Sequence, residues 1–301
     1  MKINKVLFGF TVAIAALLSS CNQDNEGAIY NSSNAGVSFS ASTLASVAVP
    51  ASKPIVTVEL FRGTKADAVS GKVTPQFVLK DSKGKDSLGV ISGVTVTDYN
   101  FAAGETKTTV NVDLSPIEVG EVYTLKLSLP EEVASIGGVK TTQIKVSKAY
   151  EWKSLGTGTF TDAFVTGSDA NPDGVTANVE IMKADGFDRY RVMNPYKDYL
   201  ASAQGKADWD NWIAPSSPEY VEFWTEDGII LYDDFFTGLY YQGAKNQAIY
   251  ACHPLGFSGV DPAHNKWWDE KTAQFAPYYY IDGVGGWNYT QRDGVIIITL
   301  P

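Results

Sequence analysis

Short segments in which apolar and polar residues alternate recur through the first half of the chain. They are rich in β-branched residues and are separated by turn-forming residues, which is the pattern of half-buried strands. No stretch between them has helical periodicity of useful length. Roughly six or seven such strands in about 115 residues favour an immunoglobulin-like sandwich. The segments are residues 55–60, 73–79, 90–96, 108–114, 123–129 and 142–146.

The second half also alternates, so we expect an all-β fold throughout. Glu226-Asp227-Gly228 is typical of a hairpin turn between two of its segments. Two long connections, residues 194–218 and 253–277, interrupt the pattern, and a short helix is expected within 196–207 and within 265–274. The pattern predicts a β-sandwich or jelly-roll-like domain with strands at residues 159–165, 177–182, 189–193, 220–225, 229–232, 248–251 and 295–300.

Charge and aromatic content divide the chain near Lys148. Residues 35–148 are predicted to form a spacer sandwich, and residues 149–301 an aromatic-rich acidic domain. Residues 22–148 carry a net charge of −1 and residues 149–301 a net charge of −11. Of the 37 aromatic residues, 28 lie at or after Tyr150, including all seven tryptophans. The acidity argues against a nucleic-acid partner, because nucleic acid requires a basic face.

The amino terminus has the parts of a secretory signal. Two lysines precede an apolar run at residues 6–18, which is too short to span a bilayer comfortably. Leu18-Ser19-Ser20-Cys21 resembles the bacterial lipobox, in which the cysteine is acylated and becomes the first residue. That resemblance implies a signal peptide at residues 1–20, a lipid anchor at Cys21 and a polar tether over residues 21–34. Cys252 is then the only thiol left, so no intramolecular disulfide is expected.

One segment of the first half resembles the Calx-beta family and its relatives. Asp98-Tyr99-Asn100-Phe101, a Gly104-Glu105 turn and the following β-branched strand occur in that family's order, and residues 123–130 are similar to its last strand. The resemblance implies an immunoglobulin-like sandwich. It does not extend to the family's calcium sites, because Asp113-Leu114-Ser115-Pro116 offers a single carboxylate where those sites use an acidic cluster.

The second half sets large rings beside acids and amides, which is the mixture that sugar recognition requires. Ring faces stack on the C–H face of a pyranose, and carboxylates and amides bind its hydroxyls. The alternative is that these rings pack in the core, since Trp and Tyr carry large buried areas. Non-catalytic binding of an extracellular glycan is the leading hypothesis, and its candidate residues are Trp209, Trp212, Trp267, Trp268, Trp287 and Tyr279.

A calcium-loop pattern begins at Asp169. Asp169, Asn171, Asp173 and Glu180 have the spacing of oxygen ligands around one hard cation, with Gly174 at the sharp turn. No helix is expected before Asp169, and Glu180 falls inside a predicted strand. Asp, Asn, Pro and Gly also suit a hairpin turn without any metal. We therefore favour a plain turn, require no cofactor and keep calcium as the alternative.

A glycoside hydrolase needs only two carboxylates about 5 to 10 Å apart. Glu222 and Asp233 are the candidate pair, because Glu222 shares its predicted strand face with Tyr220 and Trp224. Nothing else in the sequence favours catalysis. The arrangement of anchor, tether, sandwich and aromatic domain resembles outer-membrane surface lipoproteins of polysaccharide-utilisation systems. An adhesion or structural protein that binds other surface proteins is the third hypothesis.

Overall fold

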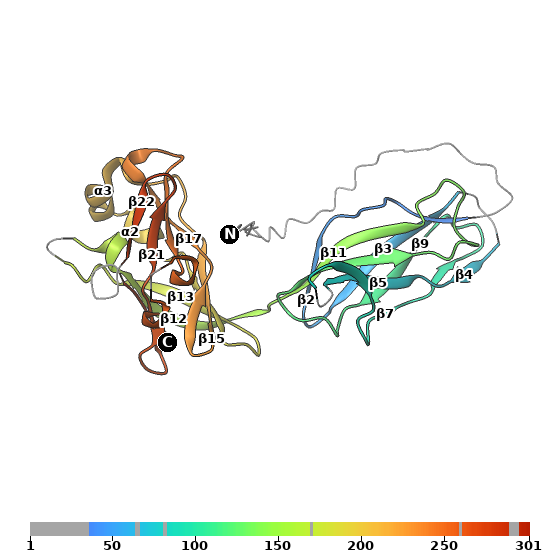
Figure 1. The fold of residues 1–301 in the computed structure, drawn as a ribbon, viewed down its shortest axis with the longest axis horizontal. Coiled ribbons are helices and arrows are strands. Elements are labelled where there is room, and N and C mark those ends of the chain that lie inside the picture. The colour runs from blue at the N-terminus through green and yellow to red at the C-terminus, as the bar shows by residue number, and fades with distance from the viewer. Residues whose placement is uncertain (1–35, 64–66, 81–82, 169–170, 259–260, 289–294) are drawn as a thin grey trace. The chain divides into compact units, whose positions relative to one another are not determined.

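The computed structural model describes residues 36–63, 67–80, 83–168, 171–258, 261–288 and 295–301. The described part of the chain is all-β, with 51% of those residues in strands and 11% in helices (Figure 1). It divides into two compact units, the first built mainly on Ile55–Pro116 and Tyr123–Lys145 and the second mainly on Val146–Pro301. The predicted fold class is therefore confirmed, and each unit is described by itself below.

The first unit is built on two antiparallel sheets and a short ribbon. Alternate residues of its strands are buried, as in β3, where Val56, Val58 and Leu60 face inward and Thr57 and Glu59 face outward. One sheet has the strand order β1 (Val37–Phe39), β3 (Ile55–Arg62), β9 (Lys107–Asp113), β7 (Thr95–Val96). The other sheet has the order β2 (Val47–Pro50), β11 (Thr141–Ala149), β10 (Val122–Ser128), β5 (Thr74–Lys80), β6 (Asp86–Gly89). The ribbon is formed by β4 (Val69–Gly71) and β8 (Tyr99–Phe101).

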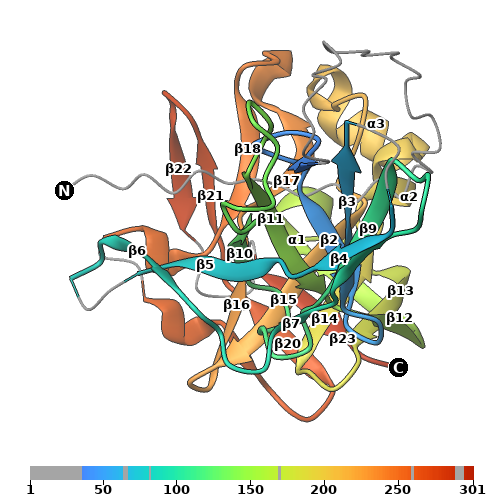
Figure 2. The same ribbon diagram turned by 90° about the vertical axis from the view of Figure 1, so that its right-hand side faces the viewer.

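The second unit is a sandwich of an eight-stranded and a four-stranded sheet. The larger sheet has the order β16 (Ile229–Tyr232), β15 (Tyr220–Glu226), β14 (Arg189–Met193), β13 (Ala177–Ala184), β12 (Trp152–Asp162), β23 (Ile296–Thr299), β20 (Thr272–Phe275), β19 (Lys266–Trp267). The smaller has β17 (Phe235–Tyr240), β18 (Ala248–Cys252), β21 (Tyr278–Ile281), β22 (Gly285–Asn288). Figure 2 shows β21 and β22 side by side.

Residues from both sheets of the second unit form one hydrophobic core. Phe223 and Phe275 from the larger sheet and Ile249, Tyr279 and Ile281 from the smaller one are all fully buried. Short helical segments lie in the connections: α1 (Ala163–Thr166), α2 (Lys197–Ala201), α3 (Ala203–Trp209), η1 (Asp210–Trp212), η2 (Tyr241–Gly243), η3 (Pro254–Gly256) and η4 (Pro262–His264).

Most predicted strands are confirmed, and two have the predicted bounds, Arg189–Met193 and Ile229–Tyr232. The hairpin turn before the latter is confirmed, with Asp227 and Gly228 at positive φ. The helix expected within 196–207 is confirmed as α2 and α3, although α3 extends to Trp209.

Other expectations are wrong. The predicted strand 90–96 is reduced to Thr95–Val96, because residues 92 and 93 form a turn with Gly93 at φ 85°. The predicted strand 159–165 ends at Asp162, whose carboxylate caps α1. Residues 265–274 contain part of the β19–β20 hairpin rather than a helix. The strands β17, β21 and β22 are absent from the predicted set.

Candidate functional site

The predicted loop platform is divided between separate places. Trp209 and Trp212 lie with their ring centroids 5.4 Å apart, and Phe164 lies 6.1 Å from Trp209 and 5.7 Å from Trp287. These rings form a loop-ring cluster made by α1, α3, η1 and β22. The Trp209 indole donates to the Val165 carbonyl at 2.6 Å, so this ring also holds α3 against α1.

Trp267 ends β19 and Trp268 follows it, and the ring contacts in the described residues do not join them to that cluster. Trp267 packs on Tyr190 and Phe223 and donates to the Thr225 hydroxyl at 2.9 Å. With Asp188, Tyr190, Thr225 and Glu270 it lines a shallow depression of about 250 Å³. Trp268 is 66% exposed and donates to Gln274. The described aromatics of the two long loops therefore do not line one groove.

Tyr279 was assigned to the binding platform, and this assignment needs correction. Its side chain is fully buried, stacks on Phe164 at 4.0 Å and donates its hydroxyl to Asp162 at 2.8 Å. Because adjacent residues of a strand point to opposite faces, Tyr278 and Tyr280 face outward when Tyr279 faces the core. Tyr279 is thus the inward-facing member of its Tyr-Tyr-Tyr run.

The outward face of the four-stranded sheet carries a set of aromatic rings that the sequence analysis missed. Cross-strand pairing aligns Phe236 with Tyr250 and Tyr250 with Tyr280, so the three residues cross β17, β18 and β21 in one row. Tyr250 is 41% exposed and the others are partly exposed. We call this surface the ring face; it consists of Phe236, Tyr240, Tyr250, Phe257, Tyr278 and Tyr280.

Contacts within the ring face hold its side chains in place. Phe257 lies 4.3 Å from Tyr278, and Tyr278 and Tyr280 are stacked at 6.5 Å. Gly286 on β22 leaves room for the Tyr278 ring, because a Cβ there would lie 2.6 Å from it. The Tyr280 hydroxyl reaches Asp282 at 3.5 Å. The structure records no hydrogen bond within the described residues for the hydroxyls of Tyr240, Tyr250 and Tyr278. The strand-like spacing of Tyr278 and Tyr280 is the feature of the sequence that points to this ring face.

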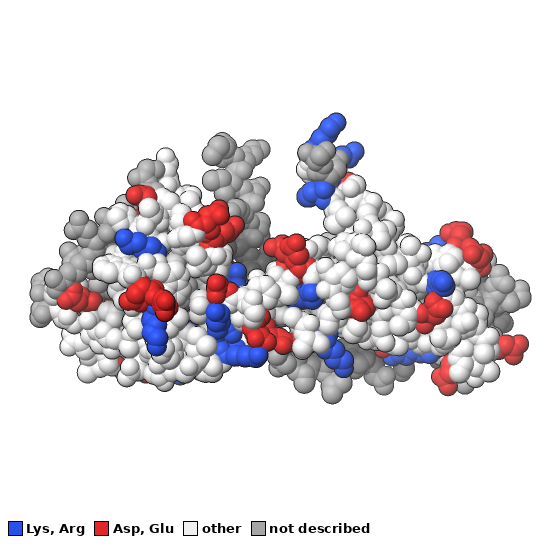
Figure 3. Space-filling model, turned by 90° about the horizontal axis from the view of Figure 1, so that it is seen from below, with Lys and Arg blue, Asp and Glu red and all other residues white. Residues whose placement is uncertain are grey.

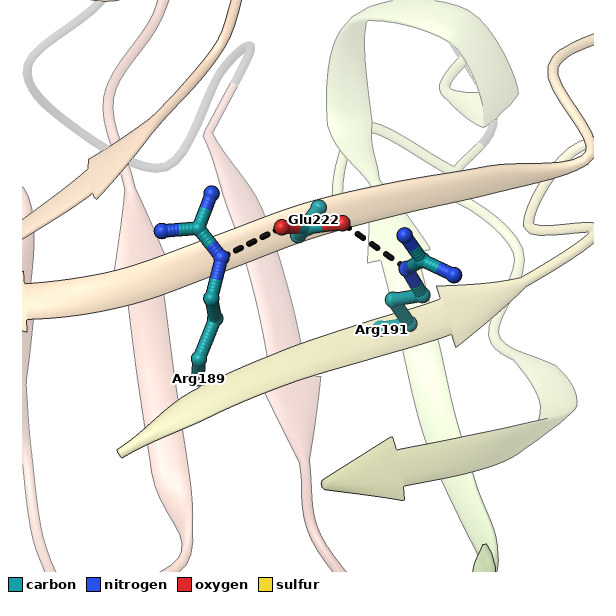
Figure 4. A network of polar contacts seen from close by, with 3 residues as sticks. All are labelled: Arg189, Arg191 and Glu222. Carbon is teal, nitrogen blue, oxygen red and sulfur yellow. Dashed lines mark hydrogen bonds and ion pairs between the residues drawn. The ribbon is translucent and has the colours of Figure 1, made fainter. Parts of the chain in front are cut away.

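Glu222, the candidate catalytic acid, is a counter-ion in the structure. Its two oxygens accept hydrogen bonds from the Nε atoms of Arg189 and Arg191, the second at 2.8 Å (Figure 4). Its side chain is 14% exposed. Both oxygens of the carboxylate are therefore engaged by guanidinium donors. Asp233 is exposed in the connection after β16. This geometry does not support the proposed carboxylate pair.

Neither His253 nor Cys252 is arranged for catalysis. His253 Nδ1 accepts from the Leu255 amide at 3.2 Å, so Nε2 carries the proton and donates to the Ile230 carbonyl at 3.0 Å. Burial lowers the pKa of His253 and keeps the ring neutral. Burial raises the pKa of the Cys252 thiol, which keeps it protonated and unreactive. Both residues therefore serve the packing between β16 and β18.

Asp162 is a fully buried ionisable group of the second unit. Its carboxyl is fully buried and accepts from the amides of Phe164 and Val165 and from the hydroxyls of Tyr196 and Tyr279, at 2.6 to 3.1 Å. Burial raises its pKa to about 6, although the hydrogen bonds act in the opposite direction. Because Asp162 caps α1 and holds Tyr279 under Phe164, it positions the base of the loop-ring cluster.

The calcium candidates are only partly described. Asp169 lies outside the described residues. The Asn171 amide donates to the Gly174 carbonyl at 2.8 Å and so closes the turn, while Glu180 is exposed on β13. Among the described residues no group of three or more acidic, His or Cys side chains is placed to hold a metal.

The predicted signal peptide and Cys21 also lie outside the described residues. In the described part of the chain, no helix has the length and apolar character needed to cross a bilayer. On the face shown in Figure 3, acidic and basic side chains are interspersed.

No protein-family model and no curated protein matches the chain. A two-domain protein of unknown function from Bacteroides fragilis is 10% identical, with 88% of this chain and 83% of that chain covered and a TM-score of 0.30. A structure of the chaperone–tip adhesin complex of CFA/I fimbriae biogenesis is 11% identical (48% and 82% covered, TM-score 0.25). The class 5 fimbriae chaperone CfaA is 10% identical (88% and 100% covered, TM-score 0.25). At these TM-scores the likenesses carry no argument about function.

Proposed function

We propose that the protein is a lipid-anchored cell-surface protein whose second unit binds a neutral glycan on the ring face without catalysis. The observation that supports this most is the row of Phe236, Tyr250 and Tyr280 on the outward face of the four-stranded sheet. Outward positions of a sheet normally carry polar residues, because rings there gain little from burial. Partly exposed rings aligned at those positions support a ligand that covers them.

The chemistry of the ring face suits a sugar chain. The six side chains are uncharged, so they can lie against the apolar C–H face of a pyranose without desolvating a charge. Four of them are tyrosines, whose hydroxyls can bind sugar hydroxyls at the rim of the contact. Their mutual contacts limit the entropy lost when a ligand binds.

Isothermal titration of the full chain in detergent against a panel of neutral polysaccharides tests this proposal. We expect Tyr250→Ala and Tyr280→Ala each to weaken binding by about tenfold, equivalent to about 1.4 kcal/mol. Trp268→Ala is the matched control, because it removes a more exposed ring that lies outside the ring face. Binding that survives both tyrosine changes, or no binding to any glycan in the panel, would overturn the proposal.

The same panel examines the loop-ring cluster and the hydrolase alternative. Trp212→Ala and Trp287→Ala show whether the loop-ring cluster extends the binding site. Release of reducing sugar from a bound polysaccharide would contradict the non-catalytic proposal. Anchoring is tested separately, because Cys21→Ser should release the protein from the detergent phase or leave it unprocessed. A Cys21→Ser protein that stays firmly membrane-bound would contradict the anchor.

A further inference from the structure

The outward face of the eight-stranded sheet carries a second organised group of side chains, centred on Arg189 and Arg191 of β14. Their guanidinium groups lie on either side of Glu222, which stands on the neighbouring strand β15 (Figure 4). They are the two arginines that the structure describes in the second unit. One carboxylate between two guanidinium groups leaves a local charge of +1 in a half of the chain whose net charge is −11.

Aromatic rings fix the orientation of both guanidinium groups. Arg191 lies 4.0 Å from the ring centroids of both Trp152 and Tyr220. Arg189 lies 4.0 Å from that of Trp224 and 5.0 Å from that of Tyr150. Rings and the Glu222 contact together restrict the rotamers of both arginines before any ligand arrives.

The outer edge of each guanidinium group is left available. Each Nε is used on Glu222, and the structure records no partner within the described residues for the terminal Nη atoms. The arginine side chains are 19% and 23% exposed, so part of each reaches solvent, and their terminal nitrogens point away from Glu222 (Figure 4). A guanidinium edge presents parallel N–H donors that match the two oxygens of a carboxylate.

We propose that the Arg189–Glu222–Arg191 group is an anion site that binds the carboxylate of a uronic-acid residue in an acidic glycan. A carboxylate would accept from the free Nη atoms, and the sugar ring would lie on the exposed parts of the neighbouring aromatic rings. Because the second half is acidic overall, its long-range field does not attract polyanions. Recognition at this site therefore depends on local bidentate hydrogen bonds.

The position of the site favours a saccharide over an acidic peptide. β14 and β15 are interior strands of the sheet, so their backbone groups are already paired with neighbours on both sides. An extended peptide gains most of its affinity by pairing with a free strand edge, which this position lacks. A saccharide needs only the donors and rings that the face presents.

Isothermal titration of the full chain at physiological salt tests the site, with tri-galacturonate, its carboxyl-reduced analogue and tri-glutamate as probes. We expect tri-galacturonate to bind about tenfold more tightly than either other probe. Arg189→Lys and Arg191→Lys keep the charge and can still pair with Glu222, but they lose the bidentate edge, so each should weaken tri-galacturonate binding by roughly fivefold. Lys245→Gln is the charge control, since Lys245 is exposed before β18 of the other sheet.

The outcomes separate this site from the ring face. Tyr280→Ala should leave tri-galacturonate binding unchanged, and the lysine variants should leave neutral-glycan binding unchanged. Any one of four results would overturn the anion site, whether or not the ring face binds glycan. These are equal binding of the carboxyl-reduced analogue, full affinity in both lysine variants, tighter binding of tri-glutamate, and no binding of tri-galacturonate. The melting temperature of each lysine variant establishes that it is folded.

Discussion

The strands of both units bury alternate apolar residues, but the residues on their outward faces differ. In the first unit, β3 buries Val56 and Val58 and exposes Thr57 and Glu59. In the second unit, β18 buries Ile249 and Ala251 and exposes Tyr250 between them. Burying alternate residues is sufficient to form either sandwich, so the outward rings are not required by the fold. The difference supports our proposal that the second unit binds a ligand and that the first is a spacer.

Each unit also buries a charged side chain, with opposite signs and different partners. Arg62 in the first unit donates to the carbonyls of Glu105, Asp67 and Ala102 at 2.6 to 2.9 Å. Asp162 in the second accepts from two amides and two tyrosine hydroxyls. Asp162 can take up a proton near neutral pH, because burial raises its pKa to about 6. The stability of the second unit is therefore expected to depend on pH through this group.

The largest effect is expected from Asp162→Ala. The change leaves four donors, three of them in buried hydrogen bonds, without their acceptor, and we expect a loss of about 3–5 kcal/mol from the stability of the second unit. Calorimetry should show its transition lowered by roughly 10 °C, with the transition of the first unit as an internal reference. Thr161→Ala, the preceding residue on β12, is the control and should change stability by less than about 1 kcal/mol. A similarly small effect of Asp162→Ala would contradict the role assigned to Asp162.

The second largest expected effect is the dependence of the second unit's stability on pH. The pKa of Asp162 is raised from its usual 3.8 to about 6, so the folded state holds the proton more tightly than the unfolded state. Stability from this group is fully present below pH ~4 and falls as pH rises towards ~6, by about 3 kcal/mol in total. Denaturant titrations from pH 4 to 7 measure the slope, and Asp162→Asn should flatten it. Equal slopes in the two proteins would show that another group is responsible.

Glu222→Gln is expected to have a smaller effect. A glutamine can accept from one arginine only and leaves the two guanidinium groups without a counter-ion, so we expect a loss of about 1–3 kcal/mol. Chemical denaturation measures this loss. Glu226→Gln, at the exposed end of the same strand, is the control. A hydrolytic activity that disappears in Glu222→Gln with stability unchanged would restore the enzyme hypothesis.

Calcium is expected to have the smallest effect, on either unit. Adding calcium to several millimolar, or removing it with a chelator, should leave both melting transitions unchanged, because Asn171 already closes its turn through Gly174. Extracellular calcium modules bind with dissociation constants of roughly 0.1–1 mM, so that range is sufficient. A rise of several degrees that is lost in Asp173→Ala would establish a calcium site at this turn.

Alternation along the chain was enough to predict the all-β class and the strands around residues 189–193 and 229–232, because strand periodicity is a local property. The Tyr278–Tyr280 run shows where this reasoning stops. Successive side chains of a strand point to opposite faces, but three identical residues do not show whether Tyr279 or its two neighbours point inward. The sequence analysis assigned Tyr279 to a ligand, and the structure places it against Asp162.

Composition by itself determined that the second half is acidic and rich in aromatic rings, and that Cys252 and Cys21 are the two cysteines of the sequence. Only the tertiary structure decided which rings share a surface. Phe236, Tyr250 and Tyr280 are distant in the sequence and meet through the pairing of β17, β18 and β21, whereas Trp267 and Trp209, both in predicted loops, fall in different places. Cross-strand register is set by contacts over long sequence separations, so the pattern of a single segment does not contain it.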